Sequence, residues 1–254
     1  MGAKIALLAF ADEDIRPALL GPRRSERAET EALVRRIHPG YDVEAADDGT
    51  LFEDTYPPVD ITYATKLTGV ELYCDQRLIF DRPSELPHHI RQAGAGRRII
   101  MHGMHSGSDS LAFAVWEDGV LIRSLSLSPD SGGIRQNIGQ PYDFELPYWA
   151  GEHPVRPEPG WPNQGPYPLP FHPLELGEEA LRAFFGFIIE GYPELADIDT
   201  ETVHLHGFRV TDPSGDEQAA REALYAEALR AMGPPQRFRM GPDGTWRDVS
   251  VGGL

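Results

Sequence analysis

The stretch from Arg97 to Ser128 limits the fold more than any other part of the chain. Three apolar runs, at Ile99–His105, Leu111–Trp116 and Leu121–Leu127, are separated by two short polar turns. The second turn is Asp118-Gly119, and because both residue types tolerate a positive φ, it favours a tight hairpin. The stretch therefore predicts an antiparallel meander of three consecutive strands.

Other apolar runs predict further strands, and helical spacing predicts helices. Ile5–Phe10 is continuously apolar, which is typical of a strand covered on both faces. The other predicted strands are Val70–Cys74, Arg77–Phe80 and Val203–Val210. The first predicted helix is Ser25–Ile37, capped by Ser25, and the second is Ser84–Ala93, stopped by a left-handed Gly94. The third has Glu178 and Glu179 at its positive end, and its apolar face consists of Leu181, Phe184, Phe185, Ile188 and Ile189. The fourth runs from Ser214 to Ala231 and begins with a capping box of Ser214 and Glu217. Together they predict an α+β fold with a mixed, largely antiparallel sheet and about three to four flanking helices.

The whole chain, residues 1–254, is expected to form a single α+β domain. Its length of 254 residues lies near the upper end of what one hydrophobic core serves. Eight prolines among residues 153–173 exclude helix and sheet interior there, and the interleaved aromatic residues favour a proline-rich arm that wraps the domain. Residues 234–254 are expected to form an irregular C-terminal tail.

The charge of the chain excludes some classes of partner. Its formal net charge is −17 at pH 7, and its isoelectric point is near 4.8. Because binding to nucleic acid and to anionic membranes depends mainly on Lys and Arg, we expect neither as a partner. The charge favours a protein partner with a basic surface, although acidity also serves solubility alone. The oligomeric state is left open.

Cysteine use and hydropathy favour the cytoplasm. Cys74 is the single cysteine, so no disulfide can form within one chain. Its apolar neighbours predict a buried thiol and not a nucleophile. The apolar run that follows Lys4 is short and has no cleavage site, and no run approaches the length of a membrane span. We therefore expect a soluble, cytoplasmic protein.

Histidines in short motifs suggest a metal site. Neutral imidazole binds Zn or Fe, and a carboxylate would complete the ligand set. In a strand, His204 and His206 point to the same face, which suits chelation. His102 and His105 point to opposite faces unless Gly103 forms a bulge. The candidate ligands are His204, His206, His102, His105, Asp109 and Glu152. The alternative is that each histidine forms hydrogen bonds locally within the sheet.

Two carboxylates after the first predicted strand suggest a second metal site. Asp12 and Asp14 follow an apolar strand, as the Mg²⁺-binding pair does in haloacid-dehalogenase-like phosphatases. Arg16 stands where that motif expects a small hydroxyl or apolar residue, and no downstream Lys and acidic motif accompanies it. A solvated acidic turn is the alternative interpretation.

Several motifs along the chain resemble those of one protein family. The opening Met1–Asp12 and the segments Met101–Ser106, Ser124–Asp130 and Tyr148–Pro154 resemble an actinobacterial family of conserved proteins of unknown function, domain-of-unknown-function family 6928. The similarity extends through His204–Phe208. The resemblance implies a bacterial domain, but it implies no activity and transfers no catalytic residues.

No complete catalytic motif occurs in the sequence, so enzyme activity is left open. The leading hypothesis is a protein-interaction module of immunity or accessory type, whose acidic surface and proline-rich arm contact a partner. One alternative is a metal-dependent hydrolase that uses the histidines with a divalent metal. A second alternative is a Mg²⁺-dependent phosphatase-like site at Asp12 and Asp14.

Overall fold

The computed structural model of the chain describes residues 2–20, 25–156, 166–231 and 237–249. A sheet of ten strands runs through the described part, and all its neighbouring strands are antiparallel. Its order is β2-β10-β4-β5-β1-β6-β7-β8-β9, and β3 also pairs with β10. The strands are β1 (Lys4–Ala11), β2 (Asp42–Ala45), β3 (Gly49–Thr50), β4 (Ile61–Leu67), β5 (Val70–Cys74), β6 (Arg98–His105), β7 (Ser110–Glu117), β8 (Val120–Ser128), β9 (Gly133–Ile138) and β10 (His204–Thr211). The prediction of an α+β fold with a largely antiparallel sheet is confirmed.

Six α-helices accompany this sheet in the described residues, more than the sequence predicted. They are α1 (Arg16–Leu19), α2 (Arg27–Ile37), α3 (His88–Ala93), α4 (Leu146–Trp149), α5 (Pro173–Phe185) and α6 (Asp216–Ala231). Beyond α6, β11 (Phe238–Met240) and β12 (Trp246–Asp248) form a separate hairpin within the tail that was expected to be irregular. None of the described helices combines the length and the apolar character that a membrane crossing requires.

β1 lies in the interior of the sheet, as its continuous apolar run predicted. It pairs with β5 on one side and with β6 on the other. Ile5 and Leu7 belong to the core beneath α5, whereas Leu8 and Phe10 belong to the core beneath α2 and α3. Because both faces of this strand are covered, an alternating polar residue would be buried without a partner.

The predicted meander is present as β6, β7 and β8. Each strand extends the predicted apolar run by one or two residues. At the turn between β7 and β8, Asp118 has a φ of 49° and Gly119 a φ of 78°. Both values lie in the left-handed region that a tight hairpin requires, which is why this dipeptide located the turn correctly.

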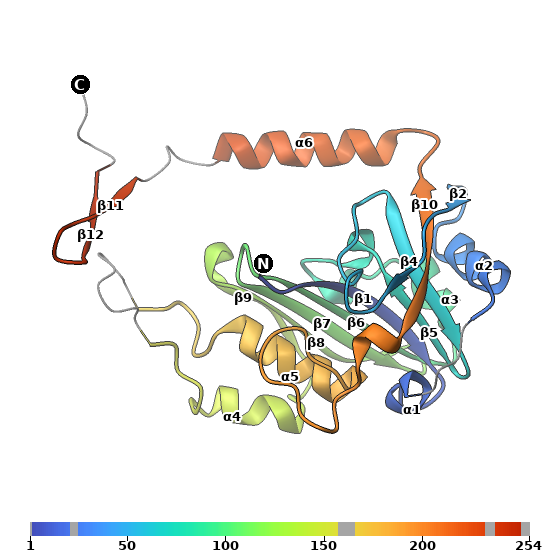
Figure 1. Cartoon of the computed structure of the whole chain (residues 1–254), viewed down its shortest axis with the longest axis horizontal. Helices are drawn as coiled ribbons and strands as arrows, with labels where there is room; N and C mark the ends of the chain where they lie inside the picture. The colour runs from blue at the N-terminus through green and yellow to red at the C-terminus, as the bar shows by residue number, and fades with distance from the viewer. Residues whose placement is uncertain (1, 21–24, 157–165, 232–236, 250–254) are drawn as a thin grey trace.

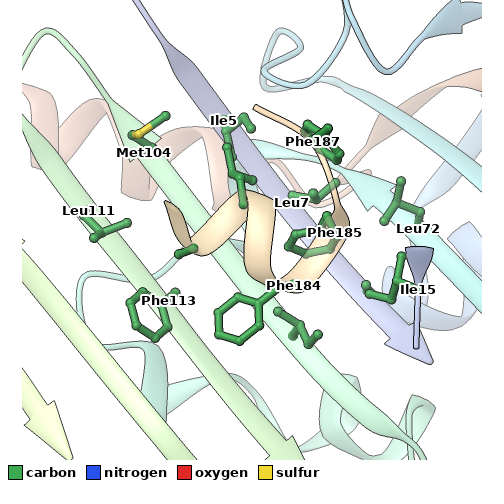
Figure 2. Packing of buried hydrophobic residues seen from close by; sticks show 14 of the residues in the cluster. Ile5, Leu7, Ile15, Leu72, Met104, Leu111, Phe113, Phe184, Phe185 and Phe187 are labelled. Carbon is green, nitrogen blue, oxygen red and sulfur yellow. The ribbon is translucent and has the colours of Figure 1, made fainter. Parts of the chain in front are cut away.

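α5 packs its apolar face on the middle of the sheet, where Phe184 and Phe185 lie above β1 and β7 (Figure 2). The ring centroids of Phe184 and Phe113 are 5.7 Å apart in an edge-to-face arrangement. The helix ends at Gly186, whose φ of 83° lets the chain reverse so that Phe187 returns to the same core. The predicted helix is confirmed as far as Phe185, whereas Ile188 and Ile189, which were expected on the same face, lie beyond its end. Figure 1 shows α4 and α5 side by side along this part of the sheet.

The predicted N-cap of α2 and the predicted conformation of the glycine after α3 are wrong. α2 starts at Arg27 with Glu26 as its N-cap residue, because the Ser25 hydroxyl is instead hydrogen-bonded to Thr65 Oγ1 at 3.0 Å. α3 ends at Ala93, as predicted, but it begins at His88 and not at Ser84. Gly94, which follows it, has a φ of −99° and is not left-handed. A Cβ on Gly94 would lie 2.6 Å from Cδ1 of Phe10. Close packing on the sheet, and not a positive φ, therefore explains the glycine.

Carboxylates that bind backbone N–H groups account for two further corrections. The Asp75 side chain accepts a hydrogen bond from Arg77 N, and residues Gln76–Leu78 form a 3-10 turn where a strand was predicted. The Asp212 carboxylate accepts hydrogen bonds from Ser214 N at 2.9 Å and from Glu217 N at 3.0 Å. Asp212, and not the predicted capping box, therefore holds the start of α6.

Two smaller predictions concern Cys74 and the start of α5. Cys74 is buried, as predicted, and its burial raises the pKa of the thiol. Glu178 and Glu179 do not lie in the first turn of a helix, because α5 already begins at Pro173. Their carboxylates therefore do not act on the positive end of that helix.

The far end of the proline-rich arm packs on the domain. Leu169 and Phe171 are buried in the core beneath α5. The Phe171 ring lies edge-to-face on Tyr148 and Trp149 of α4, at centroid distances of 5.3 and 5.0 Å. Residues 157–165 lie outside the described residues, so the course of the whole arm stays a prediction.

A glycine in β10 lies close to the backbone that connects β2 to β3. A Cβ on Gly207 would lie 2.1 Å from the backbone oxygen of Asp47. We expect Gly207→Ala to lower the free energy of unfolding by about 1 to 3 kcal/mol, because backbone must move to admit the methyl group. Urea unfolding measures the change. Thr211→Ala, at an exposed position of the same strand, is the control and should change stability little. An unchanged urea midpoint for Gly207→Ala would contradict the prediction.

Candidate functional site

Two large hydrophobic side chains are exposed on the loop between α5 and β10. Tyr192 has a relative exposure of 96% and Leu195 of 109%, the highest values among the large hydrophobic side chains of the described residues. Both lie within residues 190–196, which we call the tip loop. Isolated surface hydrophobics are common, but a tyrosine and a leucine this exposed on one short loop suit recognition by another protein.

The first side of the tip loop is fixed by Glu178 of α5. Its carboxylate accepts hydrogen bonds from the backbone N–H groups of Ile189, at 2.8 Å, and Glu190, at 3.0 Å. Burial raises the pKa of Glu178, while these two hydrogen bonds act to lower it. The carboxylate therefore anchors the point at which the loop leaves the core.

The second side of the tip loop is fixed by two arginines. Arg182 of α5 binds Asp197 through Nε at 3.1 Å and Nη2 at 3.2 Å, and Asp197 accepts a hydrogen bond from Glu194 N at 2.8 Å. Burial acts to raise the pKa of Asp197, but the hydrogen bonds from Arg182 and Glu194 lower it. Arg16 donates from Nη2 to the Ala196 oxygen at 2.8 Å. Hydrogen bonds thus fix the loop backbone at both ends before any partner binds, which reduces the entropy cost of binding.

The surroundings of the tip loop are acidic. The segment 187–203 contains no Lys or Arg, and its acidic residues are Glu190, Glu194, Asp197, Asp199 and Glu201. All of these except Asp197 are exposed. Such a surface attracts a basic partner and repels an acidic one. None of the sequence predictions included this loop, although Tyr192 and Leu195 stand among Gly, Pro and acidic residues where a purely polar loop is usual.

The predicted metal ligands on β6 lie on opposite faces of the sheet. His102 is fully buried beneath α5 and donates from Nε2 to the Gly177 oxygen at 3.0 Å. Its burial lowers its pKa to about 4, so the imidazole is neutral. His105 lies on the other face, where its Nδ1 accepts a hydrogen bond from Gly107 N at 3.0 Å. Pairing through Gly103 is regular, so no bulge brings the two rings together.

The histidines of β10 are separated from those of β6 by three strands. β4, β5 and β1 lie between β10 and β6, which corresponds to about 19 Å across the sheet. Both ring nitrogens of His206 are engaged, Nδ1 with Asp48 Oδ1 at 2.9 Å and Nε2 with the Ser25 oxygen at 2.7 Å. His204 is exposed at the start of the strand. The structure therefore does not bring the two pairs together.

The predicted carboxylate ligands are also placed apart from one another. Asp109 lies 3.6 Å from Nε2 of His172, and Glu152 is exposed after α4. Within the ranges that the structure describes, no three His, Cys, Asp or Glu side chains are grouped closely enough to hold a metal ion. A Zn or Fe site shared by the six predicted ligands stays a sequence prediction, and the separation of these ligands in the structure does not favour it.

Asp12 and Asp14 border a cavity of about 500 Å³, yet Asp12 already has a cationic partner. Nε of Arg97 donates to Asp12 Oδ1 at 2.7 Å, and Nη1 of Arg97 lies 2.9 Å from Glu71 Oε1. Asp14 accepts a hydrogen bond from Arg16 N at 3.2 Å. The guanidinium group stands where the phosphatase hypothesis needs a cation, so that hypothesis gains no support from the geometry.

A buried carboxylate that no sequence prediction included forms a polar cluster beside a cavity. Asp75, which is fully buried, follows directly after β5. It accepts hydrogen bonds from Nε2 of His38 at 3.0 Å and from Nη2 of Arg77 at 2.7 Å, and a further one from the Thr62 hydroxyl. Burial acts to raise the pKa of Asp75, but the hydrogen bonds from His38 and Arg77 lower it, so the group is ionised.

One comparison with known proteins agrees with the family that the sequence resembles. No curated protein and no solved structure matches the chain. One family model does match, over residues 5–208, and its description is "Family of unknown function (DUF6928)". The match covers the ten-stranded sheet except for Lys4 and the end of β10, and it includes the tip loop and Asp75. The chain therefore belongs to the family of unknown function DUF6928.

Proposed function

We propose that this protein is a protein-interaction module that binds a basic partner through the tip loop. The observation that carries the proposal is the near-complete exposure of Tyr192 and Leu195 on a loop whose backbone is fixed at both ends. Interface hot spots are enriched in tyrosine, and a loop that is already ordered binds with a smaller entropy cost.

The charge of the loop supports a partner of one kind. The acidic residues around Tyr192 attract a positively charged surface, and the formal net charge of −17 acts in the same direction over longer distances. On the partner we expect a small apolar pocket for Tyr192 and Leu195, surrounded by Lys and Arg. In this arrangement the two apolar side chains contribute most of the affinity, and the charges increase the association rate.

The proposal predicts the effect of the double variant Tyr192→Ser/Leu195→Ser. Partners captured by the immobilised full chain are identified, and a basic one is then purified and its affinity measured. We expect the double variant to weaken binding at least about thirtyfold, because hot-spot truncations cost about 2 kcal/mol or more. Raising the salt concentration should weaken the wild-type complex by slowing association.

The matched control is Leu224→Ser/Tyr225→Ser on α6. These residues are the same two types and are also exposed, at 68% and 67%. Both double variants should unfold at nearly the wild-type urea concentration. A basic partner that binds the tip-loop variant as tightly as the wild type, or that loses affinity only for the α6 variant, would contradict the proposed function.

A further inference from the structure

A second cavity, remote in sequence from the tip loop, lies beside the Asp75 cluster. It has a volume of about 380 Å³, which lies within the range of small-molecule sites in proteins. The end of α2, the turn after β5, α3 and the start of α6 surround it. Its apolar wall is formed by Ile37, Pro39, Leu78, Phe80, Pro87 and Ile90. Its polar wall is formed by His38, Tyr41, Arg77, His89 and Glu217.

One ring nitrogen of His38 is available to a ligand in this cavity. Nε2 lies 3.0 Å from the ionised Asp75 and donates its proton to that carboxylate, so the lone pair of the corresponding tautomer lies on Nδ1. Nδ1 has no hydrogen-bonding partner among the described residues, and it is not one of their fully enclosed unpartnered atoms. Since His38 lines the cavity, Nδ1 is accessible there as an oriented acceptor.

The arginine in the cavity wall is not freely available to a ligand. Nε and Nη2 of Arg77 donate to Asp75, and Nη1 donates to the Val210 oxygen at 2.9 Å. The positive charge of Arg77 is therefore balanced by the buried carboxylate next to it. Nη2 also donates to Thr62 Oγ1 at 3.0 Å, so one N–H of Nη1 remains, and an anionic ligand would compete for it with Glu217, which lies 3.8 Å from Nη1.

The remaining electrostatics of the cavity favour a cation. Glu217 brings a carboxylate to the wall, 3.8 Å from Nη1 of Arg77 and 3.9 Å from Nη1 of Arg221, and the half-exposed Arg221 does not line the cavity. The C-terminal end of α2, which carries a partial negative charge, lies at Ile37 and His38. Burial and the negative charge of Glu217 both raise the pKa of Tyr41, so its phenol stays protonated. The positive end of α6 is capped by Asp212.

We propose that this cavity binds a small organic ammonium ion. The ammonium group donates a hydrogen bond to Nδ1 of His38 and forms an ion pair with Glu217. The apolar body of the ligand packs against Phe80 and Ile90, which belong to the apolar wall. The site is independent of the tip loop, so either proposal can fail while the other holds.

Three probes of similar size and different charge test the proposal on the full chain. They are 2-phenylethylamine, 2-phenylethanol and 3-phenylpropanoate, titrated into ¹⁵N-labelled protein at pH 7. We expect the amine to shift the backbone amides of His38, Arg77 and Ile90 with saturation. The alcohol should bind at least about threefold more weakly, and the propanoate should leave these amides unchanged, because the cavity offers acceptors and a carboxylate but no free cation.

Two variants on α6 distinguish amine binding in the cavity from a general attraction of the amine to the acidic protein. Glu217→Gln removes the carboxylate at the cavity wall and should weaken amine binding by about threefold to fivefold, while binding of the alcohol stays the same. Glu222→Gln removes one charge from the exposed surface of the same helix, where Glu222 is hydrogen-bonded to Gln218, and should change neither.

Several results would overturn the proposed ammonium site. One is that none of the probes shifts the three amides. Another is that the propanoate binds as tightly as the amine. A third is that Glu217→Gln leaves the ratio of amine to alcohol affinity as it is in the wild type. Each of these would mean that the cavity does not select a cation through Glu217.

Discussion

Replacing Asp75 by asparagine is expected to lower the free energy of unfolding by about 3 to 5 kcal/mol. The substitution keeps the size of the side chain but removes its charge. His38 and Arg77, whose side chains are only 7% and 11% exposed, then lose the anion between them. A buried cation without a partner costs much more than the intact pair contributes, because its desolvation is no longer offset. Urea unfolding at pH 7 measures the difference.

The pH dependence of stability gives a second readout of the same group. The pKa of Asp75 is lower in the folded protein than its ordinary value of about 3.9. Its contribution to stability is therefore complete above the unfolded-state value and is lost as the pH falls through the lower folded-state value. We expect the wild type to lose stability more steeply than Asp75→Asn below about pH 4.

The matched control for Asp75→Asn is Asp81→Asn. Asp81 also pairs with an arginine, Arg135, but its side chain is 84% exposed. Exposed pairs contribute little, so this variant should unfold close to the wild type. Equal losses for the two variants, or a loss below about 1 kcal/mol for Asp75→Asn, would show that the charge of the buried cluster does not stabilise the fold.

The parts of the fold that depend on local pattern could be predicted from sequence, and those that depend on strand order could not. The meander of β6, β7 and β8 was predictable because its strands are consecutive and its turn residues have a specific geometry. The position of β10 was not, because it crosses to the far half of the sheet and inserts between β2 and β4. That crossing separates His204 and His206 from His102 and His105, which no spacing along the chain reveals.

The tip loop could have been predicted from the sequence, whereas the cavity beside Asp75 could not. A tyrosine and a leucine in an acidic loop with Gly191 and Pro193 could have been singled out from the sequence. Asp75 directly after an apolar strand is also visible, but its partner His38 lies 37 residues away in the chain. Their contact depends on how α2 packs on the sheet, so the cavity beside them could be found only from the structure.

Breaking the Arg123–Glu145 pair is the second change expected to have a large effect. Both side chains have 0% exposure, and they form two hydrogen bonds, from Nε at 2.9 Å and from Nη2 at 2.6 Å. Glu145 also accepts hydrogen bonds from Tyr142 N and Trp149 Nε1, and thereby fixes the segment before α4 against β8. Glu145→Leu leaves the guanidinium group buried without its anion and should cost about 3 to 5 kcal/mol.

The double variant Arg123→Met/Glu145→Leu distinguishes a lost ion pair from lost packing. With no charge left in the core, it should recover at least about half of the stability that Glu145→Leu loses, since apolar replacements of buried pairs are often neutral. Full recovery is not expected, because Asn137 and the Ile138 oxygen also lose a donor when Arg123 is replaced. Urea midpoints of the wild type, of the single variants Glu145→Leu and Arg123→Met, and of the double variant give the coupling energy between the two positions. A double variant less stable than both single variants would show that shape, and not charge pairing, determines the stability of this region.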